Sequence, residues 1–167
     1  VGPLMATTLW GEVVDALVAT MRATSGYRSP TSTSSGITVY DGPEVLLSGE
    51  PAGSFLVIGS TKEVSGADYA GRSGQTSATF GNRSRDEAGT IVCQAVAQSG
   101  DVDVKAVRDA ALAVMGDVED ALRADNGQGV NTGYYCLVEQ GDATISQYVT
   151  GGAVCEIEFM VTYKARI

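Results

Sequence analysis

Apolar positions recur at helical spacing in two segments of the chain. In residues 8–23 an apolar side chain returns every three or four positions, which predicts an amphipathic helix that stops before Gly26. A second such stripe runs from Val104 to Leu122. Asp101 or Asp103 can cap this second helix and Gly127 can end it, so we interpret both carboxylates as capping groups rather than as an acid–base pair.

Strand-like patterns fill most of the remaining chain. Strands are predicted at residues 37–40, 55–59, 90–98, 134–139, 143–149 and 153–163. In the final third of the chain, turns at Gly141-Asp142 and Gly151-Gly152 indicate an antiparallel meander. The order helix, strands, helix, strands predicts an α+β fold, with a mixed, mostly antiparallel sheet and two helices packed on one of its faces.

Residues 60–82 interrupt the pattern. They are rich in Gly, Ser and Thr, so we expect a long loop or a flexible hairpin there, with one strand at 76–80. The length of 167 residues suits one domain, expected over residues 5–167. Residues 1–4 precede Met5 and are expected to be an expression scar or a disordered start.

The charge balance narrows the range of partners. The chain has 11 basic and 20 acidic residues and a net charge of -9, without a basic stripe, so specific nucleic-acid binding is not expected. No apolar segment approaches the ~20 residues of a membrane-spanning helix, and no signal peptide is recognisable. We therefore expect no membrane partner and synthesis inside the cell.

The side chains that usually carry catalysis are scarce. The chain has no histidine, which removes Ser-His and Cys-His pairs and most zinc sites. Cys93, Cys136 and Cys155 lie in apolar strand patterns and are expected to be buried thiols. Because phosphate-binding and nucleophile-elbow motifs are also missing, we expect no catalytic residue, cofactor or metal, and no enzyme. An enzyme that uses carboxylates, such as Glu156 and Glu158, or a thiol stays open, as does a module that binds a small ligand.

Two groups of charged residues are candidates for protein contacts. Arg83, Arg85, Asp86 and Glu87 are close together before a strand, and form either a solvated loop or a polar contact with a neighbouring subunit or partner. The second helix is acidic: seven of the 20 acidic residues lie between positions 101 and 125. Asp109, Asp117 and Asp120 are the candidates for an exposed acidic face.

The order of several short segments carries a resemblance to a known family. These segments are Val39-Tyr40-Asp41-Gly42-Pro43, Leu56-Val57-Ile58-Gly59, Arg85-Asp86-Glu87, Ser99-Gly100-Asp101 before a helix that contains Arg108, and the closing Ala165-Arg166-Ile167. Together with the N-terminal amphipathic helix, their order and spacing resemble the lambda-type tail terminator proteins of long-tailed (siphovirus-type) bacteriophages. The resemblance extends over nearly the whole chain from Thr8, except for residues 60–82.

The resemblance implies an α+β subunit of a hexameric ring. Such a ring caps the last ring of tail-tube protein, stops polymerisation and presents a joining surface to the head–tail connector protein. It implies a place in the neck of the virion after assembly in the bacterial cytoplasm, with DNA passing through the ring without specific binding. An acidic lumen repels phosphate within a Debye length of ~8 Å, and the Asp109, Asp117 and Asp120 face is the candidate lining. The alternative is another neck or tail component, either a connector or a tail-tube subunit.

Overall fold

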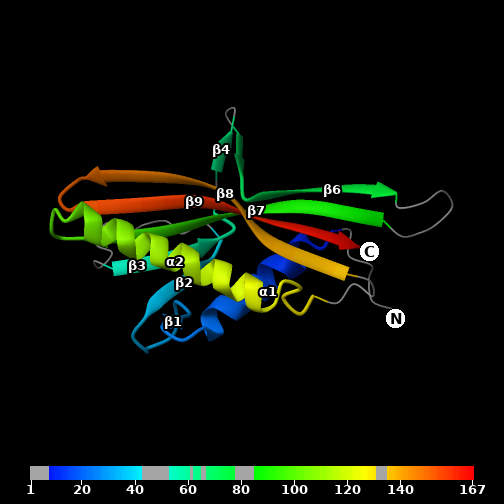
Figure 1. Ribbon diagram of the computed structural model, residues 1–167, viewed down its shortest axis with the longest axis horizontal. Helices are drawn as coiled ribbons and strands as arrows, with labels where there is room; N and C mark the ends of the chain where they lie inside the picture. The colour runs from blue at the N-terminus through cyan, green and yellow to red at the C-terminus, as the bar shows by residue number, and fades with distance from the viewer. Residues whose placement is uncertain (1–7, 43–52, 61, 65–66, 78–84, 131–134) are drawn as a thin grey trace.

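Two helices and nine strands make up the described residues of the computed structural model, which are 8–42, 53–60, 62–64, 67–77, 85–130 and 135–167 (Figure 1). The helices are α1 (Trp10–Ala23) and α2 (Val104–Ala124). The strands are β1 (Tyr27–Arg28), β2 (Ile37–Asp41), β3 (Gly53–Ile58), β4 (Lys62–Val64), β5 (Ala67–Tyr69), β6 (Gly71–Ser77), β7 (Arg85–Ser99), β8 (Tyr135–Val149) and β9 (Ala153–Arg166). Residues 1–4, predicted to be a scar or a disordered start, lie outside the described part.

The long strand β7 organises the sheet. The main order is β1-β2-β3-β7-β9-β8, and β6 pairs with the first half of β7 on the side where β3 pairs with the second half. The β1–β2 and β2–β3 pairs are parallel and the other pairs are antiparallel. In Figure 1 the long strands cross near the middle of the molecule, as the twist of a sheet requires. The predicted α+β fold with a mixed, mostly antiparallel sheet is confirmed.

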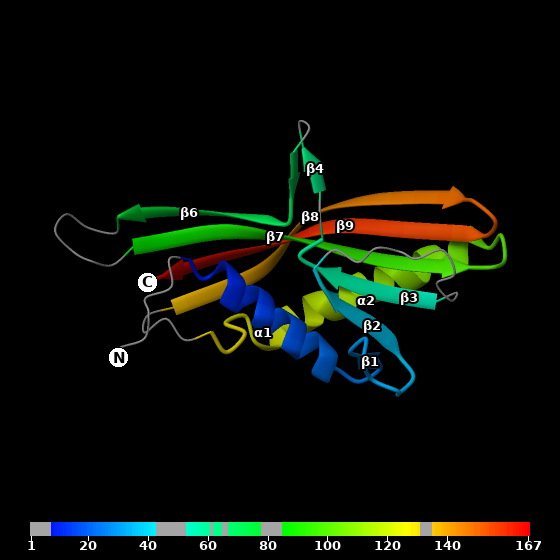
Figure 2. The ribbon, with the colours of Figure 1, turned by 180° about the vertical axis from the view of Figure 1, so that it is seen from behind.

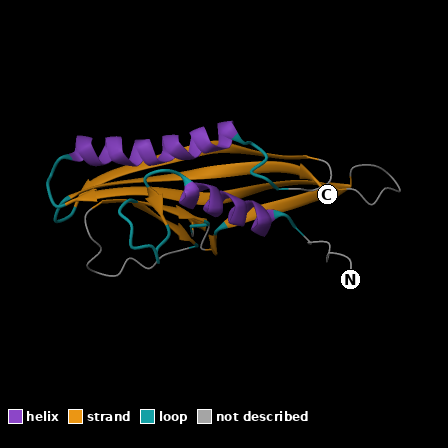
Figure 3. Cartoon of the chain, turned by 90° about the horizontal axis from the view of Figure 1, so that it is seen from below, coloured by secondary structure: helices purple, strands orange, loops and turns teal. Residues whose placement is uncertain are grey.

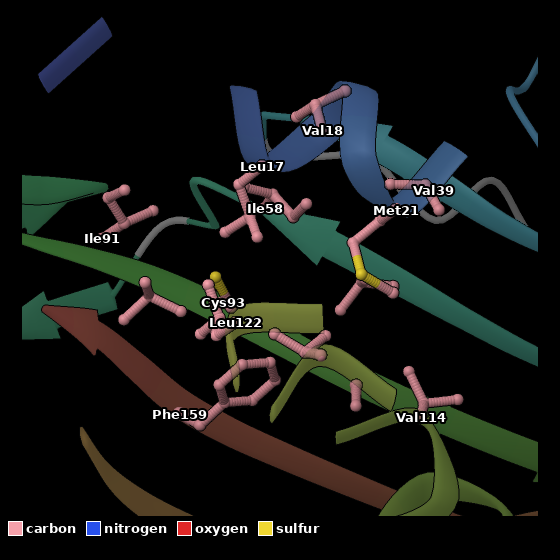
Figure 4. Close-up of a cluster of buried hydrophobic side chains, with 14 of the residues drawn as sticks. Leu17, Val18, Met21, Val39, Ile58, Ile91, Cys93, Val114, Leu122 and Phe159 are labelled. Carbon is pink, nitrogen blue, oxygen red and sulfur yellow. The ribbon is translucent and has the colours of Figure 1, made fainter. Parts of the chain in front are cut away.

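Both helices bury their apolar stripes on the same face of this sheet. The predicted alternation in β7 is confirmed, because Ile91, Cys93, Ala95 and Ala97 all belong to the main core with the inward residues of both helices. Figure 4 shows Leu17 and Met21 of α1 and Leu122 of α2 meeting side chains of β3, β7 and β9. Figure 3 shows α2 lying along the strands. Each buried side chain of this size contributes about 1.5–3 kcal/mol to folding.

The ends of the helices follow from local hydrogen bonds. The carboxylate of Asp103 accepts from the backbone N–H of Ala106 at 3.1 Å, so it is the cap of α2 that the sequence predicted. Asp101 has another place: its carbonyl accepts from the N–H of Ala153 at 2.7 Å and ties the start of α2 to β9. Helix α1 ends where the N–H of Thr24 bonds the carbonyl of Met21, three residues before Tyr27 begins β1.

Residues 60–82, predicted to be a long loop or a flexible hairpin with one strand at 76–80, contain a hairpin and a longer strand in their described part. Strands β4 and β5 form a hairpin that stands away from the sheet in Figures 1 and 2, and β6 starts at Gly71 instead of at residue 76. Residues 78–80 of the predicted strand lie outside the described part. The first residue of β6 has to be a glycine, because a β-carbon on Gly71 would be 2.2 Å from Nε1 of Trp10 and 2.3 Å from the carbonyl oxygen of Thr90. This glycine therefore reflects close packing rather than a loop.

The predicted turn at Gly141-Asp142 is wrong. Strand β8 continues through it with a β-bulge between Gln140 and Ala143, whereas the turn at Gly151-Gly152 is confirmed. The bulge inserts one extra residue, so side chains after it change faces. Ile145 therefore pairs with Ile157 and Val149 with Ala153, on the face of the sheet that the helices cover.

Candidate assembly surfaces

Glu87 is the most deeply buried charged residue of the predicted Arg83–Glu87 contact group. Its side chain is 1% exposed. One carboxylate oxygen accepts from the hydroxyl of Thr8 at 2.6 Å, the N–H of Leu9 at 2.9 Å and the hydroxyl of Tyr163 at 2.5 Å. The other accepts from the amide of Gln75 at 2.7 Å. The prediction of a partner contact is wrong for Glu87, which instead joins α1, β6 and β9 within one subunit.

These hydrogen bonds decide the charge state of Glu87. Burial alone would raise the pKa of the carboxyl, but the hydrogen bonds from Thr8, Tyr163, Gln75 and the Leu9 N–H outweigh burial and hold the pKa below its ordinary value. Glu87 is therefore an ionised carboxylate with hydrogen-bond donors around it and no cationic side chain among its described partners.

The rest of the group stays closer to solvent. Asp86 forms a two-pronged ion pair with Arg166 at 2.8 and 3.2 Å, which lowers the pKa of Asp86. Both side chains of this pair are 38% exposed. The guanidinium of exposed Arg85 donates to Gln75 at 3.2 Å. Arg83 lies outside the described residues. Arg85 and Asp86 thus remain candidates for a contact, although Asp86 already has an intramolecular partner.

The three acidic residues predicted on α2 do not share one environment. Asp109 and Asp120 are exposed, and Asp109 is paired with Lys105 one turn earlier. Asp117 lies on the flank toward β1, where the hydroxyl of Tyr27 donates to it at 2.6 Å. Burial and this bond raise the pKa of Tyr27. The prediction of one shared exposed face is therefore wrong for Asp117, and the lining of a lumen stays a prediction for Asp109 and Asp120.

The outer edge of β8 is an exposed surface that sequence reasoning missed. Every residue from Gly141 to Thr150 is exposed, and no described strand pairs with this edge. Three apolar side chains of β8 are open to solvent, Ile145 at 49%, Tyr148 at 42% and Val149 at 54%, and Val102 beside the start of α2 is 74% exposed. The alternation of residues 143–149 was a signal for this strand, but the bulge that sets its faces had no signal in the sequence.

Two of the thiols considered for chemistry, Cys93 and Cys155, are buried. Burial raises the pKa of the Cys93 thiol to about 12, and burial also raises the pKa of the Cys155 thiol. The side chain of Cys136 is outside the described part. Glu156 and Glu158 lie on the polar face of β9, as predicted, and Glu156 accepts from the hydroxyl of Tyr148 at 2.9 Å. No group of three potential metal ligands occurs among the described residues.

A polar hollow lies where the end of α2 meets β8. It measures about 420 Å³ and is lined by Glu119, Leu122, Arg123, Asn126, Val138, Glu139 and Gln140. Arg123 forms an ion pair with Glu119 there. The side-chain oxygen of Gln140 is buried and accepts no hydrogen bond from the described residues. Its lining includes the carboxylates of Glu119 and Glu139.

No described helix has the length and apolar character needed to span a bilayer. No protein-family model matches the chain, and no curated protein matches it either.

Proposed function

We propose that the protein is a non-enzymatic structural assembly protein of a long-tailed bacteriophage, with the role of a tail terminator. In this role a hexameric ring of the chain binds the last ring of tail-tube protein, stops its polymerisation, and presents a joining surface to the head–tail connector protein. DNA passes through the ring without specific binding, and assembly takes place in the host cytoplasm before the ring becomes part of the virion neck.

The observation that carries the proposal is the exposed, uncharged segment Ala143–Val149 of the edge strand β8. Monomeric proteins normally protect such edges with charge, proline or a covering segment. Here Ala143–Val149 contains no charged residue and no proline, and its side chains are open to solvent. A protein that works by assembly has a use for such an edge, because a second protein can cover it. The net charge of -9 and the exposed carboxylates of Asp109 and Asp120 favour a ring that does not hold DNA.

Electron microscopy with tail-tube protein tests this function. We expect the purified chain to form rings, alone or on tubes, and to fix the length of tubes when it is added during their polymerisation. Tubes that keep growing at the same rate and carry no additional ring at their ends would contradict the proposal.

The runner-up is a tail-tube subunit or a connector, favoured by the same exposed edge. The same polymerisation experiment separates these roles. A tube subunit is incorporated along the tube and lengthens it, a connector binds finished ends without changing their growth, and a terminator shortens the length distribution.

A further inference from the structure

We propose that the Ala143–Val149 edge of β8 is a self-pairing edge: it joins the same edge of a second copy of the chain as an antiparallel strand, about a two-fold axis at Ser146. The sheets of the two subunits then continue across the junction. This contact is additional to the ring of the proposed function: because it is two-fold, it cannot join neighbours around the ring, and it would join two rings face to face.

The chemistry of the edge selects a strand as its partner. The outer side of an edge strand offers a row of backbone donors and acceptors at strand spacing, which another extended strand satisfies best. The sequence Ala-Thr-Ile-Ser-Gln-Tyr-Val favours this conformation, since Thr, Ile, Tyr and Val are strong strand formers. The exposed side chains of Ile145, Tyr148 and Val149 add apolar surface that pairing would remove from water.

Self-complementarity identifies the second copy as the occupant. Pairing about Ser146 places Ser146 opposite itself, Thr144 opposite Tyr148, and Ala143 opposite Val149 in each direction. Thr with Tyr and Ala with Val are compatible cross-strand neighbours, and the small Ser146 fits the point where a side chain meets its own copy. The register uses the whole uncharged segment and leaves Asp142 outside it.

Charge does not oppose this contact although the protein is acidic. Glu156 and Glu158 lie on β9, one strand behind the edge. In the paired sheets the two copies of Glu156 are three strand spacings apart, about 14 Å at ~4.8 Å per spacing, and the copies of Glu158 are farther apart. Both distances exceed the Debye length of ~8 Å at physiological salt, so their repulsion is screened. The uncharged Ala143–Val149 segment acts as a spacer between two acidic surfaces.

The bulge in β8 determines which side chains of the edge are on the helix side of the sheet. It places Ile145 and Val149 on the face that the helices cover. A two-fold axis perpendicular to the sheet keeps the helices of both subunits on this same side. On that face Ile145 of each copy lies opposite Gln147 of the other, and Ala143 lies opposite Val149.

A single introduced cysteine tests the axis. Directly opposed residues of antiparallel strands have Cα atoms about 4.5–5.5 Å apart, within the range of a disulfide. We expect S146C to form a disulfide-linked dimer under mild oxidation about ten times faster than the matched control T144C, whose two copies would be about 14 Å apart by strand rise. The wild-type protein controls for its own three cysteines. Equal rates for S146C, T144C and the wild type would overturn the proposal.

A second set of variants tests the contribution of Ile145 while the disulfide stays at position 146. In the S146C background, I145K brings two ammonium groups to the junction, and we expect the rate of dimer formation to fall about fivefold or more by like-charge repulsion. A113K, on the exposed face of α2, is the matched control and should leave the rate unchanged. An equal fall in both variants would also overturn the proposal. Crosslinked dimers from a protein that never caps tubes would refute the terminator role but not this contact, and the reverse result would refute only this contact.

Discussion

Removing the carboxylate of Glu87 should destabilise the fold far more than its place in a charged segment indicates. Two of its four hydrogen bonds, from the Leu9 N–H and the Tyr163 hydroxyl, are buried. Leaving a buried donor unpaired costs roughly 1–3 kcal/mol, so E87A should lower the free energy of unfolding by about 4 kcal/mol. This is a large part of the 5–15 kcal/mol of a typical domain. E87Q keeps one acceptor oxygen but places an amide donor against Gln75, and should lose about 2 kcal/mol.

Urea unfolding followed by tryptophan fluorescence measures this loss. The single tryptophan, Trp10, lies one residue beyond Leu9 and donates to the Thr90 carbonyl at 2.9 Å, so its emission reports the helix that Glu87 holds. D86N is the neighbouring control, and because Asp86 is paired near the surface, its loss should be clearly smaller than that of E87A. A loss below about 1 kcal/mol in E87A would refute the reasoning.

The pH dependence gives an independent check on Glu87. Because its pKa is lower in the folded state than the ordinary value of about 4.3, its ionised form contributes stability above that ordinary value. This contribution is lost as the pH falls through the folded pKa. The stability difference between the wild type and E87Q should therefore be full at neutral pH and should shrink below about pH 4. A difference that stays constant under acid would show that ionisation of Glu87 is not its source.

Three further substitutions test local features by thermal or urea unfolding. G116A should stabilise the protein by about 0.5–1 kcal/mol, since a β-carbon at this helical position meets nothing within 4 Å; a lower melting temperature would contradict this. D103A should lose about 1 kcal/mol by removing the cap of α2, whereas D103N should retain most of it, and equal losses would count against a capping role. G152A should lose at least about 2 kcal/mol, because its φ is +153° and a β-carbon would lie 2.0 Å from the carbonyl oxygen of Ser99; an unchanged midpoint would show that the turn adapts freely.

The elements that the sequence predicts well are those in which apolar and polar residues alternate with a regular period. Helix α2 has both an apolar stripe and the Asp103 cap, and β9 alternates apolar and polar residues over its length, so both were predicted close to their observed bounds. Strand β6 was predicted to start five residues too late because Gly71 is required by the packing of Trp10, and a contact with a residue 61 positions away leaves no local pattern. The bulge in β8 likewise has no periodic signal.

The candidate surfaces were harder to predict because charge does not specify exposure. Glu87 is in a run of charged residues, yet it continues the alternation of Ile91 and Cys93 backward through Gly89 and therefore belongs to the core face. Continuing this alternation from Ile91 back to Gly89 and Glu87 would have predicted that Glu87 lies on the core face. What the period cannot supply is the set of four donors, since these come from three distant parts of the chain.

The pairing of β7 with β9 also has a mechanical meaning. The two strands are joined at fourteen consecutive positions, from Asp86 opposite Arg166 to Ser99 opposite Ala153. When force pulls two such strands along their common axis, the backbone bonds between them share the load and must break together, whereas a force across them opens one pair at a time. Resistance to force depends on the rate of unfolding rather than on equilibrium stability. The molecule should thus be stiff along these strands and should yield first at β4 and β5, whose hairpin stands outside this ladder (Figure 2).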